Sequence, residues 1–130
     1  MAASGVNAGS AGYALQEGIE RPIRKRLTLG TVETILAVPA AGSKGSNQKK
    51  VLILRCAAET GAGTPTLILD VLGSDGSTVY VLRGNSALSA GEVYREVDIV
   101  LSPGEILRGT ASTAVSVTGS YIDIGRGNNG

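Results

Sequence analysis

The sequence predicts an all-β protein: an antiparallel β-sandwich of the jelly-roll or Ig-like type with an extended N-terminal arm. Short runs rich in β-branched and other apolar residues recur along the chain, separated by Gly, Pro, Asn, Asp or Ser. No segment between these runs has the length and 3.6-residue apolar period of a helix that would connect parallel strands. The spacing favours about seven or eight strands and leaves the choice between jelly-roll and Ig-like topology open.

The chain divides into an arm over residues 1–30, a sandwich over residues 31–124 and a tail over residues 125–130. Residues 1–12 are almost all small or polar, so they bury too little apolar surface to offset the entropy lost on ordering. Pro22 disfavours a helix that continues through the arm. We therefore expect an extended arm, or one short helical piece near residues 13–17, and a flexible Gly-rich tail.

Seven strands are predicted within the sandwich. They span residues 31–38, 50–59, 66–72, 78–83, 92–100, 106–111 and 114–124. Several alternate apolar residues with others, as a half-buried strand does. The expected inward-facing sets are Val32, Leu36 and Val38; Leu52, Leu54, Cys56 and Ala58; Leu67, Leu69 and Val71; and Val93, Val97 and Ile99. The last strand has apolar residues at both odd and even positions, which predicts a bulge near Gly119 or burial on both faces.

Turn residues between the strands favour antiparallel pairing. Asp75 and Gly76 lie between two predicted strands, and Asp-Gly is a strong signal for a two-residue hairpin. Pro103 and Gly104 occupy the second and third positions of a predicted type II turn. Residues 40–48 are rich in Gly, Ser and Lys and are expected to form an exposed loop.

The composition excludes several kinds of active site. The 130 residues include no His and one Cys, so the chain has no Ser-His-Asp triad, imidazole metal site or intrachain disulfide. The absence of Phe and Trp removes most stacking platforms for bases or sugars. The start does not resemble a signal peptide and no apolar run approaches a membrane span, which favours synthesis in a reducing cytosol. We expect no catalytic residue, metal or cofactor.

Three clusters that could carry chemistry have simpler interpretations. Asp70 and Asp75 supply too few oxygens for calcium, and Asp75 begins a turn. Glu96 and Asp98 share one face of a predicted strand, about 7 Å apart, and are interpreted as neighbouring solvated charges. Cys56 lies on an apolar face and is expected to be buried and inert.

Charge is distributed unevenly along the chain. Residues 1–50 carry seven basic and three acidic side chains, whereas residues 51–130 carry five basic and eight acidic ones. One half could therefore attract the other half of a neighbouring copy, or the charges could simply be solvated. The predicted partner-binding residues of the arm are Tyr13, Leu15, Ile19, Arg21, Ile23, Arg24, Lys25 and Arg26. Because aromatic residues are not interleaved with these basic residues, an acidic protein surface is favoured over nucleic acid as the target.

Residues 32–124 resemble a group of small β-sandwich virion proteins of tailed bacteriophages. The resemblance is carried by turn and strand motifs in a fixed order. These are Val38-Pro39-Ala40, the strand and polar loop at 51–60, Val-Tyr-Val-Leu at 79–82, Leu-Ser-Pro-Gly-Glu at 101–105 and Val-Thr-Gly-Ser-Tyr-Ile-Asp-Ile at 117–124. The family pattern has no catalytic residues.

The resemblance implies a non-enzymatic structural protein of the virion, made in the host cytoplasm. The favoured role is that of a capsid decoration or cement protein or a fibre base, with the major capsid protein or other virion subunits as partners. A head–tail connector, neck or tail accessory protein is the alternative, and a carbohydrate-binding sandwich is a second alternative. A sandwich of this size without Phe or Trp has a light core, which also predicts a homo-oligomer. No membrane and no specific nucleic acid is expected as a partner.

Overall fold

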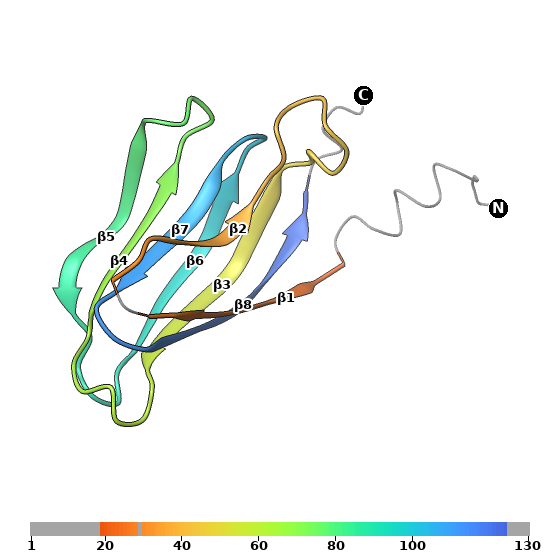
Figure 1. Cartoon of the computed structure of the whole chain (residues 1–130). Helices are drawn as coiled ribbons and strands as arrows, with labels where there is room; N and C mark the ends of the chain where they lie inside the picture. Colours follow the sequence, from red (N-terminus) through yellow and green to blue (C-terminus); the bar gives the residue numbers. More distant parts are fainter. Residues whose placement is uncertain (1–18, 29, 125–130) are drawn as a thin grey trace.

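The computed structural model describes residues 19–28 and 30–124, and in these ranges it contains eight β-strands and no helix (Figure 1). The strands are β1 Arg21–Leu27, β2 Glu33–Ala37, β3 Lys49–Ala58, β4 Thr66–Leu72, β5 Val79–Ala87, β6 Val93–Leu101, β7 Ile106–Ala111 and β8 Val115–Asp123. The expectations for the arm up to residue 18 and for the tail lie outside the described residues.

The strands form two four-stranded sheets that pack face to face. Sheet A has the order β1-β8-β3-β6 and sheet B has the order β2-β7-β4-β5. Every pairing is antiparallel. Among the described strands, β4 and β5 are the only pair that are consecutive in the chain and also neighbours in a sheet. Every other connection crosses from one sheet to the other. This order is that of a jelly roll, whereas an Ig-like sandwich pairs several consecutive strands.

The core between the sheets is aliphatic. The predicted inward face of β4 is confirmed: Leu67 and Leu69 have no exposed surface and Val71 has 6%. The largest fully buried side chains are Leu27, Leu54, Leu67, Leu69, Leu88, Leu101, Leu107, Val51, Val115, Val117 and Cys56. The described residues thus form one core of Leu and Val with no large ring at its centre.

Strand β1 lies where the sequence placed the end of the arm. Residues 21–27 pair with β8 from Arg21 opposite Tyr121 to Leu27 opposite Val115, so the sandwich begins before residue 31. The physical reason is the burial of Ile23 and Leu27, which are 4% and 0% exposed. Pro22 is tolerated because β1 is an edge strand, where one side of the backbone needs no ladder hydrogen bonds.

The sheet has a bulge near Gly119, but it lies in β3 and not in the last strand, where it was predicted; β8 itself keeps a regular register. The register of β3 against β8 shifts between Val51 and Ile53, one residue before Gly119 pairs with Leu54. The shift explains why Val51, rather than the predicted Leu52, is fully buried at the start of β3. The backbones approach closely here, and a Cβ added at Gly119 would overlap the carbonyl oxygen of Ile53.

Two other predicted faces differ from the structure. Val93 and Val97 of β6 are exposed, whereas Ile99 is buried as predicted. The reason is Asp98, whose φ of 57° places it in the left-handed region and changes which side chains face the core. Val32, expected to face inward, lies before β2 and is 54% exposed.

Candidate functional site

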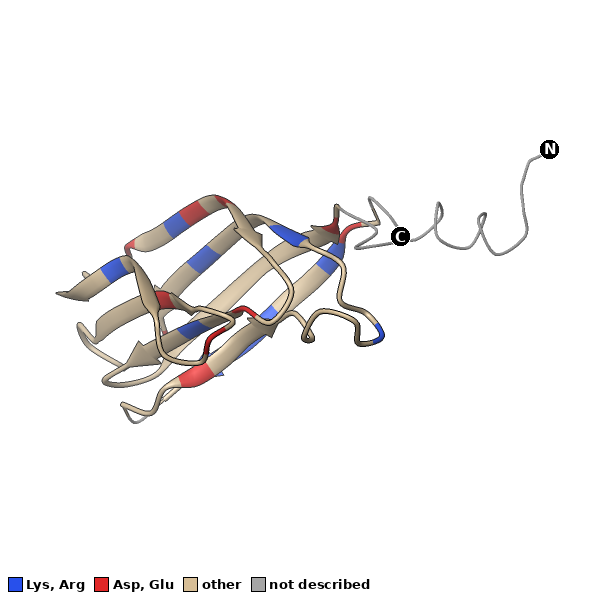
Figure 2. Cartoon of the chain, turned by 90° about the horizontal axis from the view of Figure 1, so that it is seen from above, with Lys and Arg blue, Asp and Glu red and all other residues tan. Residues whose placement is uncertain are grey.

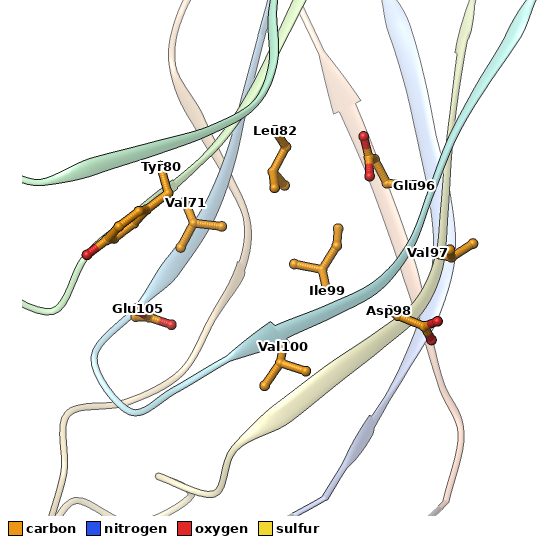
Figure 3. A pocket seen from close by; sticks show the side chains of 9 residues that line it. All are labelled: Val71, Tyr80, Leu82, Glu96, Val97, Asp98, Ile99, Val100 and Glu105. Atoms are coloured by element: carbon orange, nitrogen blue, oxygen red, sulfur yellow. The ribbon is translucent and has the colours of Figure 1, made fainter.

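The free edges of the two sheets form a groove on one side of the sandwich. Strand β5 ends sheet B and β6 ends sheet A, and the open groove between them has a volume of about 390 Å³ (Figure 3). The residues that line it are Val71, Tyr80, Leu82, Glu96, Val97, Asp98, Ile99, Val100 and Glu105. In the close-up, Leu82 and Ile99 lie in the middle of the groove, between Tyr80 and Glu105 on one side and Glu96 and Asp98 on the other.

Three carboxylates give this groove an acidic character. Glu105 Oε1 accepts a hydrogen bond from the backbone N–H of Ser102 at 2.8 Å, so it also closes the turn after β6. Asp98 has a side chain that is 67% exposed, and its Oδ1 lies 3.5 Å from Lys50 Nζ. Glu96 Oε2 accepts a hydrogen bond from the Tyr94 hydroxyl. Burial, together with this hydrogen bond, raises the pKa of Tyr94 to about 12.

Three exposed apolar side chains form the rim of the groove. They are Tyr80 of β5 and Val97 and Val100 of β6, which are between 47% and 57% exposed. Val79, Val81 and Val93 on the same two strands are also exposed but do not line the groove. Single exposed apolar residues are ordinary on a protein surface, but three that share one groove form a patch typical of interaction sites. The groove therefore combines apolar surface with negative charge.

Asp98 also determines how the edge of β6 can be used. A left-handed residue in the middle of a strand breaks the regular series of free N–H and C=O groups along its edge. Another strand would pair poorly with such an edge. Contacts at the groove are therefore expected to run mainly through side chains.

The predicted partner-binding residues of the arm differ in how deeply the structure buries them. Tyr13 and Leu15 lie outside the described residues. Ile19 is 46% exposed, but Ile23 is 4% exposed and belongs to the core. Arg21 is partly buried at the start of β1, and its Nε has no partner among the described residues.

The other three basic residues of this group lie on β1. Lys25 Nζ lies 3.2 Å from Glu33 Oε1, and Arg26 Nε lies 2.7 Å from Glu59 Oε2. Arg24 is exposed on the outer face of sheet A. The basic cluster therefore belongs to the surface of the sandwich, and two of its charges are already paired within the chain.

The remaining polar candidates have structural partners. Asp70 Oδ1 accepts a hydrogen bond from Arg108 Nε at 2.8 Å on the outer face of sheet B. Asp75 accepts hydrogen bonds from the backbone N–H groups of Ser77 and Thr78, which with the Thr78 hydroxyl lower its pKa to about 2. Within residues 19–28 and 30–124, no three His, Cys, Asp or Glu side chains are grouped closely enough to hold a metal ion.

Cys56 is buried, as predicted. Its side chain has no exposed surface and lies on β3 opposite Tyr94 of β6. Burial raises the pKa of the thiol to about 12, so at neutral pH it is protonated. In the described part of the chain, no helix is long and apolar enough to cross a membrane.

Comparisons with known proteins find similarity in solved structures only: a scan against family models and a search of curated proteins each give no match. A pentameric capsid protein isolated from metagenomic phage sequences is 20% identical, with a TM-score of 0.49, over 87% of this chain and 68% of that chain. A further structure of a pentameric capsid protein from metagenomic phage sequences is 21% identical, with a TM-score of 0.47, over 86% of this chain and 69% of that chain. A chain of infectious bursal disease virus, Gx strain, is 14% identical, with a TM-score of 0.49, over 87% of this chain and 34% of that chain. This chain thus spans about one third of the length of the last.

Proposed function

We propose that the protein is a non-enzymatic structural protein of a tailed-phage virion, bound on the capsid exterior as a decoration or cement protein or as the base of a fibre. The observation that carries this proposal is the β5–β6 groove with its exposed apolar rim. A jelly roll that leaves Tyr80, Val97 and Val100 exposed at a groove between two edge strands is suited to burying them against another subunit. Its mechanism is adhesion.

The positions of the virion-like sequence motifs support the same proposal. Residues 101–105 end β6 and form the turn before β7, and Gly104 has the positive φ of 87° that the predicted type II turn requires. Residues 117–124 comprise most of β8, which pairs with both β1 and β3. Two of the motifs that carry the resemblance therefore organise sheet A and the turn that lines the groove.

A particle-binding experiment tests the proposal. Purified protein is mixed with capsids that lack it, the capsids are pelleted, and bound copies are counted and located by electron microscopy. We expect saturable binding over the shell. The variant Val97→Asp/Val100→Asp places charges on the groove rim and should lose binding, because each substituted carboxylate would be buried at the contact.

The matched control is Val32→Asp, which changes a valine that is 54% exposed, between Val100 at 47% and Val97 at 57%, but that lies before β2 and does not line the groove. It should bind as the unmodified protein does. Binding confined to one vertex would favour the head–tail or neck alternative. Absence of binding, or equal binding by all three proteins, would overturn the role assigned to the groove.

A further inference from the structure

Three arginines form a row across the outer face of sheet A. Arg24 of β1 pairs with Thr118 of β8, Thr118 pairs with Arg55 of β3, and Arg55 pairs directly with Arg95 of β6. All four side chains are exposed. Neighbouring strands are about 4.8 Å apart, so the row extends roughly 14 Å across the sheet. Figure 2 shows Lys and Arg as blue bands along the strands.

The arginine row, Arg24, Arg55 and Arg95, carries uncompensated charge. None of the three guanidinium groups forms an ion pair with another described residue, whereas Arg26 and Lys50 on the same face are paired with Glu59 and Asp98. Like charges directly opposite each other on neighbouring strands destabilise a sheet. An anionic partner placed over the row would remove this repulsion.

The surface beside the row is hollowed because β8 carries small side chains there. One open groove of about 370 Å³ is lined by Arg24, Lys25, Arg26, Glu59, Ser116, Val117 and Thr118. A second, of about 390 Å³, is lined by Glu20, Arg21, Pro22, Gly119 and Ser120. The two grooves follow one another along β8 as a shallow trough, and Arg24 is the member of the row that lines it.

We propose that the partner of the β5–β6 groove is a second copy of this chain, whose arginine row and trough receive the acidic rim of the groove. The inference rests on the proposed assembly function and names the partner of the same site. The charges are complementary: Glu96, Asp98 and Glu105 line the groove, and the arginine row lies on the opposing surface. The apolar rim is covered in the same contact.

A symmetric contact between two β5–β6 edges fits these charges less well. A two-fold axis at β6 would bring Glu96 and Asp98 of one copy toward the same residues of the other, and like charges at an interface are costly. Asp98 also interrupts the backbone edge that such strand pairing needs. A contact between two different surfaces avoids both problems, and by repetition it builds a ring when the rotation between copies closes.

The experiment uses sedimentation velocity of the full chain without capsids, at low and high salt. The face variant is Arg24→Glu/Arg55→Glu, and the groove variant is Glu96→Lys/Asp98→Asn. Asn is chosen at position 98 because it tolerates the left-handed backbone there. Lys44→Glu, in the exposed loop before β3, is the charge-change control. Circular dichroism verifies that each variant is folded.

We expect the unmodified protein and the control to associate more weakly as salt rises. Each variant alone should associate more than about tenfold more weakly, because like charges then meet at the contact. A mixture of the two variants should recover association, since the reversed face fits the reversed groove and the two unmodified surfaces fit each other.

Several outcomes would overturn the proposal. They are a monomeric unmodified protein, variants that associate normally, and a mixture that fails to recover association. A labelled single-stranded oligonucleotide is included, and its binding in place of self-association would assign the arginine row to nucleic acid instead. No capsid is present in this experiment. If self-association fails, the particle-binding experiment therefore still tests the proposed function independently.

Discussion

Lys49 at the start of β3 and Asp123 at the end of β8 form the least exposed ion pair among the described residues. Lys49 Nζ lies 2.8 Å from Asp123 Oδ1, and the two side chains are 12% and 11% exposed. The ammonium group also lies 5.6 Å from the centre of the Tyr121 ring. The pair joins β3 to β8 beside Leu101, which is fully buried.

Removing one partner of this pair should destabilise the fold. Asp123→Ala leaves the Lys49 charge nearly buried without a carboxylate, and we expect a loss of about 3 kcal/mol in the free energy of unfolding. The double variant Lys49→Met/Asp123→Leu should recover most of that loss, because buried ion pairs are often replaceable by apolar residues. Urea denaturation of both variants measures this. A double variant as unstable as the single one would contradict this explanation.

Gly119→Ala should be among the most damaging single substitutions. The added methyl group would overlap the Ile53 carbonyl at the bulge between β3 and β8. We expect a loss of about 3 kcal/mol or more, because backbone cannot move aside as a flexible side chain does. Gly84→Ala on β5 is the control, since no atom lies within 4 Å of the added methyl. Thermal unfolding that shifts equally in both variants would show that close approach is not the cause.

The Cys56 thiol should link stability to pH only in alkaline solution. Its pKa is raised from 9.0 to about 12 by burial, so above pH 9 the unfolded chain loses this proton before the folded one does. The stabilising contribution is present below pH 9 and is lost as the pH rises toward 12. Urea titrations should show this loss, and Cys56→Ala should show less of it. Equal losses would assign the dependence to other groups, among them Tyr94, whose pKa is also raised to about 12.

A thiol reagent gives a second measurement of the same residue. Native protein at pH 8 should react slowly and unfolded protein at once, because the folded thiol is both buried and protonated. Immediate stoichiometric labelling of folded protein would contradict the burial of Cys56.

The sequence was sufficient to predict the strands whose apolar residues alternate clearly. β4 and β7 were predicted at residues 66–72 and 106–111, the bounds that the structure gives. β1 was missed because only Ile23 and Leu27 on its inward face are buried apolar residues, while Pro22 and four basic residues obscure the alternation. Its pairing with β8, distant in sequence, decides its structure.

The candidate site was less accessible to sequence reasoning. The face of β6 was misassigned before Asp98, at Val93 and Val97, because nothing in the local pattern indicates that Asp98 is left-handed. The groove and the arginine row both depend on which strands are neighbours. Arg24, Arg55 and Arg95 are far apart in the chain and meet only through the jelly-roll order of sheet A. The uneven charge of the two halves pointed toward Arg24 alone, because Arg55 and Arg95 lie in the half with more acidic than basic side chains.

Arg55→Glu should stabilise the isolated sandwich even though it disrupts the proposed self-association. The new carboxylate would face Arg95 directly, replacing a like-charge pair with an opposite-charge pair. We expect a gain of about 1 kcal/mol at low salt, smaller at high salt. Arg55→Glu/Arg95→Glu restores like charges and should lose the gain. Denaturation in dilute solution measures it, and an unchanged or lower stability of the single variant would contradict direct opposition of these residues.

Two truncations should separate the arm from β1. Deleting residues 1–18 leaves β1 intact, so we expect a folded sandwich with a thermal midpoint close to that of the full chain. Deleting residues 1–26 removes nearly all of β1, including Ile23, and uncovers the edge of β8. Loss of one buried aliphatic side chain costs about 2–5 kcal/mol, and the lost ladder adds to that, within a typical total stability of about 5–15 kcal/mol.

The longer deletion should therefore be poorly folded by circular dichroism and hydrogen exchange, and its failure to bind capsids would say nothing about the arm. The shorter deletion provides the informative comparison. If it is folded but binds capsids more weakly than the full chain, residues 1–18 contribute to attachment, as predicted for Tyr13 and Leu15. If it binds equally well, attachment belongs to the sandwich. A stable fold after deletion of residues 1–26 would contradict the assignment of β1 to the core.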